Sequence, residues 1–549
     1  MSNVTKIKEL LHVFDIMSDL LTALSALQGD ELRARLPDLF AAIDTADDAT
    51  APLLASLAAR AFEGENGLAT LRHEASLPFQ LRGLSHPDSR VRALTATQLT
   101  RLASTMADIT ALRDRGILGR LAGLIGDEVL SVSERAAGFF AACAAAGPEA
   151  LGLLLSHEPT LQALKALGGD GSRSASVLRL RAFALFASLA ATGDAQFRLV
   201  DDRALLAPAL ALWRGDDPLV RLNAVELFAN LARPPVGVPW LREHDILLEM
   251  CAVLDVAEGE DMLLDLLRPA VLGCLATILE VGGAPAATAL LHEQRLVARL
   301  WPLLYARQPE QLIASLAVLK VAASTVGGMR ATLALHAESA AADAGESGGG
   351  PLARHLRAHD ERTRVGAMAV TAQLLESFAD TGAAGAAGAA GGDTMDIVAD
   401  APTPVGDAAG VLSPAALDSS MRSLITMASI EGTTSAADAI AQMGRSLSDD
   451  VRVASLEVLH GIARVPWGAA MLCDSEGVLE LLLTMESVHA VPAEELRRKH
   501  AVAKALAQWP AALESLGATA AAQIRAYAAA GPFSPQPARA PKMAAPLTL

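Results

Sequence analysis

The sequence has few aromatic residues, few cysteines and no long apolar run, and each shortage excludes a class of protein. The 549 residues include 12 Phe, 5 Trp and only 2 Tyr, although 52% are hydrophobic. The apolar residues are mostly Ala and Leu, which favour helices over strands. The four cysteines stand far apart without a C-x-x-C pair, which argues against a disulfide framework and a structural zinc site.

Hydropathy and charge narrow the remaining classes. No window contains the ~20 uninterrupted apolar residues of a membrane span, because Gly, Pro and Glu interrupt even the most apolar stretch, about residues 136–155. Residues 1–10 are polar and lack the apolar core of a signal peptide. The net charge of −17 argues against a nucleic-acid binder. We expect a soluble intracellular protein that binds neither nucleic acid nor membrane and is a monomer when free.

One helical pattern recurs along the chain. It is clearest after Asp216 and Asp217, either of which can cap a helix that begins with Pro218. Apolar residues follow Val220 at four, seven, eight and eleven positions, which forms one stripe of a helix. The frame recurs every 41 to 50 residues, apart from one gap of 88. Its anchor residues are Val91, Val132, Leu178, Val220, Leu267, Ile313, Thr363, Val451 and Arg497.

This period predicts the fold. The side chain four residues after an anchor is small or β-branched, and the one eight residues after is mostly bulky. Shorter Leu-rich helices are expected before the anchor helices, for example around Leu161 and Leu481. Paired helices with a period of about 40–47 residues are typical of HEAT and armadillo repeats. Because one pair cannot bury its apolar face alone, we predict an all-α, armadillo/HEAT-like α-solenoid superhelix.

An arginine follows seven of the nine anchors: Arg92, Arg179, Arg221, Arg268, Arg364, Arg452 and Arg498. We expect each to pair with an acid near the start of the same helix, such as Asp88, Asp217, Asp360 or Asp449. Because these acids would cancel the positive field, we interpret the arginines as a structural ladder between repeats and not as a basic binding stripe.

Low-complexity segments divide the repeats. We predict N-terminal and central repeats over residues 1–375, with a flexible link at about 337–351. A disordered insert over 376–412 contains Gly-Ala-Ala triplets, which cannot build a core, and accounts for the gap of 88 residues. C-terminal repeats over 413–530 and a disordered tail over 531–549 follow.

Signals for catalysis are weak. His355 and His359 have a spacing that places two imidazoles on one helical face, but no third ligand accompanies them and arginines surround them. The Gly-Glu-Ser-Gly sequence at 345–348 is off-pattern for a serine nucleophile. We therefore predict no catalytic, cofactor-binding or metal-binding residues, no cofactor, and no enzymatic activity. Asn230 has no counterparts that would form the asparagine ladder of peptide-binding armadillo proteins, so a folded partner is expected.

Three segments of the chain resemble parts of one known family. The first, residues 81–91 (LRGLSHPDSRV), is similar to the family's Leu-rich helix that leads into a His-Pro-Asp turn. The second, residues 454–468 followed by 474–478, resembles the family's penultimate repeat. The third consists of residues 504–507, 524–527 and 531–533 near the C-terminus. Together they resemble the proteasome non-ATPase regulatory subunit 5 family, whose members are assembly chaperones of the 26S proteasome base.

The resemblance implies a non-catalytic chaperone that binds the C-terminal domain of a base ATPase subunit and is released on maturation of the regulatory particle. Its partners would be base ATPase subunits and associated base non-ATPase subunits, in the cytoplasm and also in the nucleus. The resemblance singles out no individual partner-binding residue. The alternative is a generic armadillo/HEAT adaptor for trafficking or for a cytoskeletal scaffold, which the repeats alone would support equally well.

Overall fold

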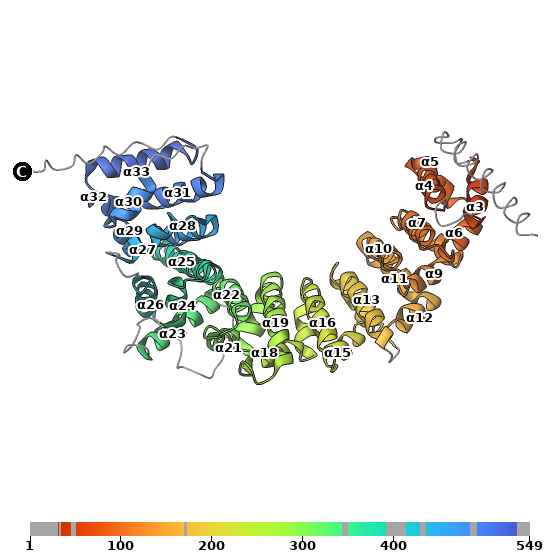
Figure 1. Cartoon of the computed structure of the whole chain (residues 1–549), viewed down its shortest axis with the longest axis horizontal. Coiled ribbons are helices and arrows are strands. Elements are labelled where there is room, and N and C mark those ends of the chain that lie inside the picture. Colours follow the sequence, from red (N-terminus) through yellow and green to blue (C-terminus); the bar gives the residue numbers. More distant parts are fainter. Residues whose placement is uncertain are drawn as a thin grey trace, which may run out of the picture. The chain divides into compact units, whose positions relative to one another are not determined.

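The computed structural model describes residues 31, 34–45, 51–169, 173–342, 350–390, 413–428, 435–483 and 491–534. Regular structure within these residues is entirely helical, without a strand (Figure 1). The chain divides into two compact units, a first unit over residues 1–241 and a second unit over residues 242–549.

The first unit contains short and long helices in alternation. Their bounds are α3 (Leu36–Thr45), α4 (Ala51–Ala61), α5 (Gly64–Arg72), η1 (Glu74–Ser76), α6 (Leu77–Leu84), α7 (Ser89–Thr100), α8 (Met106–Asp114), α9 (Ile117–Leu124), α10 (Leu130–Ala146), α11 (Pro148–Ser156), α12 (Glu158–Ala166), α13 (Arg173–Ala190), α14 (Asp194–Asp201), α15 (Ala207–Trp213) and α16 (Pro218–Leu231). Helix α17 (Gly237–Glu243) crosses the boundary between the units.

The second unit continues the same alternation. Its helices are α18 (Ile246–Asp255), α19 (Met262–Val281), α20 (Gly283–Ala287), the π-helix η2 (Thr288–Glu293), α21 (Leu296–Leu303), α22 (Pro309–Ala323), α23 (Val326–Ala342), α24 (Gly350–Leu356), α25 (Glu361–Ala390), α26 (Pro414–Thr426), α27 (Ala436–Met443), α28 (Asp449–Ala463), α29 (Pro466–Cys473), α30 (Glu476–Leu483), α31 (Ala493–Leu506), α32 (Pro510–Glu514) and α33 (Ala518–Ala530).

Each repeat contains three helices, and the third is the long helix that carries the anchor. In the first unit α8, α9 and α10 form one such repeat, and in the second unit α26, α27 and α28 form another. The predicted helix pairs are thus incomplete, since a further short helix precedes each pair. Three helices per repeat make the protein an armadillo-like all-α solenoid.

The anchor helices pack on one another within each unit. Helices α7, α10, α13 and α16 follow in order in the first unit, and α19, α22, α25, α28 and α31 follow in the second (Figure 1). Direct packing of α25 on α28 places Thr363 and Val451 in neighbouring repeats, as the gap of 88 residues implied. The small residues predicted four positions after an anchor are buried in the helices whose anchor is correct, for example Ala136, Ala182 and Ala224.

Two of the nine predicted anchors are wrong by two residues. In α22 the buried stripe begins at Gln311, so the predicted anchor Ile313 faces outward. In α31 it begins at Glu495, and the predicted anchor Arg497 is exposed. The corrected stripes, at the same spacing of four, eight and eleven residues, are Gln311, Ser315, Leu319 and Ala322 in α22 and Glu495, Lys499, Ala503 and Leu506 in α31. Polar residues at core positions hid the true register.

Three of the seven ladder arginines reach an acceptor in the following repeat. Arg92 donates to both carboxylate oxygens of Asp127 in the next repeat, at 2.7 and 2.9 Å. Arg268 reaches Gln311 at 2.8 Å, and Arg452 reaches Glu495 at 2.9 Å. Each of these arginines also donates to a backbone carbonyl in the turn before its own helix, and Arg268 donates in addition to the Val253 carbonyl of α18. These contacts support the interpretation of the arginines as a structural ladder.

Arg268 pairs with Asp265 and Arg498 pairs with Glu494, and each of these acids lies near the start of the arginine's own helix. Of the four acids named as examples, only Asp449 pairs with its arginine, Arg452. The other three acids cap helix starts, where their carboxylates accept backbone N–H groups that lack helical partners. Asp88 caps α7 and pairs with Arg90, while Asp217 caps α16 and Asp360 accepts from the Thr363 N–H. Arg221 lies over the Trp213 ring at 4.9 Å, away from Asp217.

The structure differs from the predicted segment boundaries in two places. Helix α25 continues to Ala390, into the segment predicted as an insert from residue 376, and α23 continues to Ala342, into the link predicted from residue 337. Both extensions are rich in Ala, the strongest helix former. Residues 343–349, 391–412 and 535–549 lie outside the described residues.

Candidate partner-binding surface

The solvent-exposed sides of the anchor helices offer one candidate surface in the second unit. Between α22 and α25 this surface contains a groove of about 300 Å³. Ile313 and Ala317 line it from α22, and Val365 and Ala369 line it from α25. The helices approach closely because position 366 is glycine, where a Cβ would lie 3.1 Å from the Leu316 side chain. The floor of the groove is therefore aliphatic and suits a branched apolar side chain.

Charged residues surround this groove. Lys320, Arg362 and Asp450 line its edges, and none of them forms an ion pair with a residue in the described ranges. Glu361 accepts a hydrogen bond from the Ser448 hydroxyl, which ties α25 to the start of α28. The groove thus combines an apolar floor with uncommitted charges of both signs, as is typical of protein-binding surfaces.

The following anchor helices carry a charged surface instead. Arg464 at the end of α28 donates to Asp380 of α25 at 2.6 Å. Arg498 of α31 pairs with Glu457 of α28 at 3.0 Å. Burial, and then the nearby Arg464 guanidinium, lowers the pKa of His460 between these pairs. Ion pairs that cross between helices therefore hold the surface over α28 and α31, whereas among the described residues no ion pair joins α22 to α25 across the groove.

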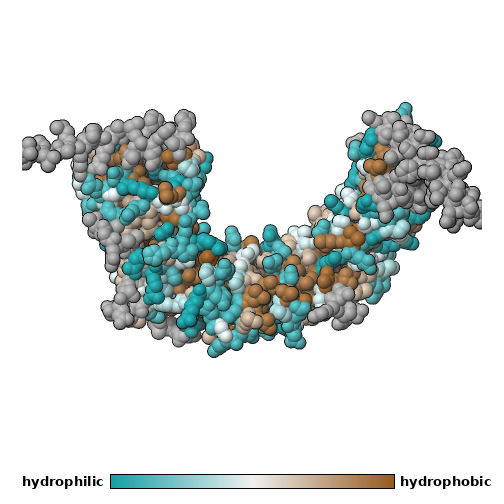
Figure 2. All heavy atoms as spheres, viewed as in Figure 1, coloured by the Kyte–Doolittle hydropathy of each residue, from teal (hydrophilic) through white to brown (hydrophobic). Residues whose placement is uncertain are grey.

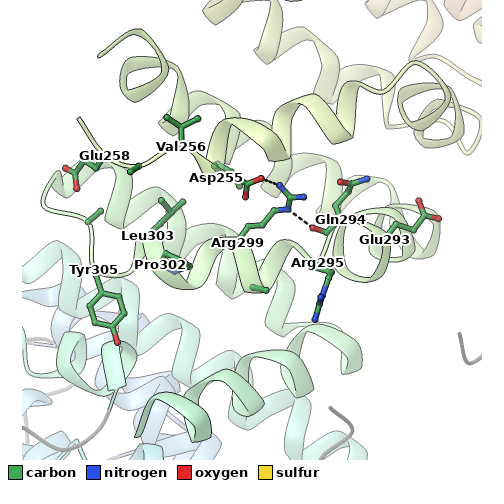
Figure 3. Close-up of a pocket in the computed structure, with 14 residues that line it drawn as sticks. Asp255, Val256, Glu258, Glu293, Gln294, Arg295, Arg299, Pro302, Leu303 and Tyr305 are labelled. Atoms are coloured by element: carbon green, nitrogen blue, oxygen red, sulfur yellow. Dashed lines mark hydrogen bonds and ion pairs between the residues drawn. The ribbon is translucent and has the colours of Figure 1, made fainter. Parts of the chain in front are cut away.

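A second cavity, of about 700 Å³, lies beside α21 (Figure 3). Arg299 reaches across its wall to Asp255 and donates to the Gln294 carbonyl at 2.8 Å, as Figure 3 shows. Glu258 accepts the backbone N–H groups of Arg307 and Gln308 at 2.9 and 3.1 Å. These polar groups hold the loops around the cavity.

The histidine pair does not form a metal site. The Nε2 atom of His355 lies 2.6 Å from the Leu304 carbonyl oxygen, and burial lowers the pKa of this imidazole. Helix α24 ends at Leu356, so His359 lies in the following turn and does not share the predicted helical face. Within the described ranges no three His, Cys, Asp or Glu side chains are placed to hold a metal ion. Residues 345–348 lie outside those ranges.

The cysteines are inert core residues. All four lie in the described residues and are buried, and none of them forms a disulfide. Burial raises the pKa of the Cys143 and Cys251 thiols to about 12 and that of Cys473 to about 11. Thiolate chemistry at neutral pH is therefore disfavoured.

His336 in α23 is a buried histidine without a hydrogen-bond partner at either ring nitrogen in the described structure. Burial lowers its pKa from 6.5 to about 4. The unfolded chain binds the proton more readily, so stability is retained above pH 6.5 and lost as the pH falls toward 4. The loss should reach about 3 kcal/mol, from the difference between the two pKa values.

The variant His336→Leu tests whether His336 causes this loss of stability at low pH. Between pH 7 and pH 4 its free energy of unfolding in urea should fall about 3 kcal/mol less than that of the unchanged protein. His359→Leu, at an exposed position, should keep the original acid sensitivity. Equal acid sensitivity of His336→Leu and the unchanged protein would show that His336 is readily protonated in the folded state.

The residues of the α22–α25 groove were not predicted as surface. The shifted register placed Ile313 and Ala317 in the core, although both line the groove. The signal that could have found the correct register is Pro309, because a proline in the first turn marks a helix start, as Pro218 does in α16.

The helices and surfaces define a repeat solenoid without an identifiable catalytic centre in the described residues. Among solved structures, the alignment with one engineered protein covers 84% of this chain and 99% of that protein's chain, with a TM-score of 0.44 and 16% identity. The alignment with a designed armadillo repeat protein covers 45% of this chain and 99% of that protein's chain, with a TM-score of 0.29 and 23% identity.

Sequence comparison supplies the family. The model of the family described as "Proteasome non-ATPase 26S subunit" matches residues 2–283, just over half of the chain. The chain therefore belongs to this family. The match includes the first of the three resembling segments, residues 81–91, whereas the second and third lie outside it.

Individual relatives agree with the family. The 26S proteasome non-ATPase regulatory subunit 5 of Mus musculus and that of Homo sapiens are each 25% identical to this chain over 182 residues. Each alignment covers 33% of this chain and 34% of the relative. The matched part thus spans about a third of the length of these relatives.

Proposed function

We propose that this protein is a non-catalytic chaperone for assembly of the base of the 26S proteasome regulatory particle. In this proposal it binds the C-terminal domain of a base ATPase subunit, with associated base non-ATPase subunits as further partners, and is released on maturation. It acts in the cytoplasm and also in the nucleus. The observation that carries the proposal is the family match over residues 2–283.

The surface of the second unit supports binding of a folded domain. Ile313 and Val365 offer an apolar anchor point in the α22–α25 groove, and Lys320, Arg362 and Asp450 surround it. A specific and reversible interface needs about 1,600 Å² of total buried area, which successive anchor helices can supply. The net charge of −17 favours a basic surface on the partner and would raise the association rate.

Affinity capture with the tagged full-length chain tests the proposal. Captured material should contain base ATPase subunits and little of the 20S core particle, because the chaperone leaves as the particle matures. Purified C-terminal domains of the ATPase subunits, measured one at a time, should then identify a direct partner. The proposal would be overturned if the tagged chain captured no base ATPase subunit and bound none of the purified C-terminal domains. Capture of vesicle-coat or cytoskeletal proteins without base subunits would favour the generic adaptor.

A further inference from the structure

Helix α19 exposes an apolar side that the proposed function has not yet used. Met262, Leu263 and Leu266 are 81%, 48% and 55% exposed, which is unusual for three large apolar side chains on two turns of one helix. The outward positions that follow are Pro269, Ala270, Gly273, Ala276 and Thr277, so no charged side chain lies on this side between Met262 and Thr277. Figure 2 shows apolar residues gathered over α18 and α19. We call this surface the α19 face.

The opposite side of α19 forms core. Leu267, Val271, Leu275 and Ile278 are buried, and the helix packs on α18 and α22. Its two inner charged residues, Asp265 and Arg268, pair with each other at 2.8 Å. Among the described helices α19 is the one long and apolar enough to cross a membrane by length and composition, but half of the window is buried. A helix that is apolar on both sides requires a covering layer on its exposed side.

Unneutralised carboxylates lie at both ends of the α19 face. Glu258, Glu260 and Asp261 precede the helix, and Glu280 lies near its end. None of the four forms an ion pair with a described residue. Glu258 binds backbone N–H groups and Asp261 caps α19 through the Leu263 and Leu264 N–H groups, whereas Glu260 and Glu280 are exposed. The surface is therefore an apolar strip between two acidic ends.

We propose that the α19 face docks a basic amphipathic helix of the partner, with aliphatic side chains on Met262, Leu263 and Leu266 and with Lys or Arg near Glu260 and Glu280. The inference rests on the proposed function, in which that helix belongs to a base ATPase subunit. Helix-in-groove docking buries apolar side chains at intervals of three and four residues. The flanking carboxylates select a basic partner and repel an acidic one.

Charge also argues against two other occupants. A second copy of this chain in a two-fold contact would bring the same surface to itself, so Glu260 and Glu280 would face carboxylates. An anionic bilayer would be repelled by the same acids. Binding of either occupant can be measured. A second copy would appear as a dimer in size-exclusion chromatography with light scattering, and a bilayer would make the protein float with phosphatidylserine vesicles.

The variant Met262→Glu/Leu266→Glu tests the apolar contact. The unchanged protein is expected to bind one ATPase C-terminal domain, and the affinity of the variant for that domain should be lower by at least about 30-fold. A loss of this size is typical when apolar side chains at the centre of an interface are removed. Both positions are exposed, so the melting temperature should be preserved. Leu447→Glu is the matched control, a fully exposed leucine of the same unit, and should change the affinity by less than about twofold.

The variant Glu260→Lys/Glu280→Lys tests the charges. The association rate at low salt should fall about tenfold, and its dependence on salt should weaken. Glu258 and Asp261 are left unchanged because they hold the loop and cap the helix. An unchanged association rate would contradict selection of a basic partner.

A photo-crosslinking residue at position 262 identifies the occupant directly. The expected product joins α19 to a peptide of a base ATPase subunit with Lys or Arg on one side and aliphatic residues on the other. Full binding by Met262→Glu/Leu266→Glu would overturn this inference while leaving the chaperone proposal intact. Failure of the unchanged protein to bind any base ATPase domain would overturn the chaperone proposal itself. A crosslink to a second copy or to lipid would also overturn the inference.

Discussion

Replacement of Arg268 by alanine should lower the free energy of unfolding of the second unit by about 3–5 kcal/mol, the range found when one partner of a buried ion pair is removed. Arg268 is fully buried in α19. It donates to the Asp265 carboxylate and to the Gln311 side-chain oxygen, both at 2.8 Å. It also donates to the Val256 carbonyl at 2.6 Å, which fixes the turn between α18 and α19.

The size of this effect follows from what the variant leaves behind. Asp265 and Gln311 are themselves buried, so the truncation strands a carboxylate and an amide away from water. The remaining contact of Asp265, from the Gly259 N–H at 2.9 Å, does not neutralise its charge. Urea unfolding monitored by circular dichroism measures the loss.

Two further variants separate the network from general disruption. Arg307→Ala, at an exposed position of the same unit, should change the free energy of unfolding by less than about 0.5 kcal/mol. The triple variant Arg268→Met/Asp265→Leu/Gln311→Leu should recover most of the loss, since apolar residues of similar volume often replace a buried ion pair at no cost. A loss below about 1 kcal/mol in Arg268→Ala would show that water reaches the site.

The second large effect is expected at Glu495 in α31. Its carboxylate accepts from Arg452 of α28 at 2.9 Å and lies 3.3 Å from the Lys499 ammonium. The side chains of Glu495 and Lys499 are 5% and 1% exposed. Glu495→Ala removes the buried carboxylate that lies between the Arg452 guanidinium and the Lys499 ammonium at the α28–α31 contact, so the free energy of unfolding should fall by about 3–5 kcal/mol.

The neighbouring residue supplies a matched control. Glu494 pairs with Arg497 and Arg498 but its side chain is 45% exposed, so Glu494→Ala should cost less than about 1 kcal/mol. The double variant Glu495→Leu/Lys499→Met removes both buried charges and should be more stable than Glu495→Ala alone. Equal costs for Glu494→Ala and Glu495→Ala would contradict the corrected register of α31.

The sequence predicted the repeat architecture because the apolar spacing is regular at seven of nine anchor positions. It failed in α22 and α31, where Gln311, Glu495 and Lys499 occupy core positions. A pattern of apolar residues cannot identify a buried ion pair, since the partners come from a neighbouring repeat. The first helix of each repeat was missed because some are short, such as α20 with five residues and α17 with seven.

The candidate surfaces were less predictable than the fold. Leu266 and Leu267 are adjacent leucines, yet one is 55% exposed and the other is buried. Their difference depends on which side of α19 meets α22, and composition does not record it. The α22–α25 groove likewise requires Gly366 to lie against Leu316, a contact between helices about 50 residues apart.

The arginine ladder limits how this chain can be shortened or recombined. Arg452 uses a carboxylate that belongs to the next repeat, and Arg92 does the same through Asp127. A fragment that ends after α30 would keep Arg452 without Glu495, and a repeat transplanted from another solenoid would have to bring an acceptor for the arginine before it. The repeats are therefore not interchangeable modules, and fragments for crystallography or binding assays should end beyond the acceptor of their last ladder arginine.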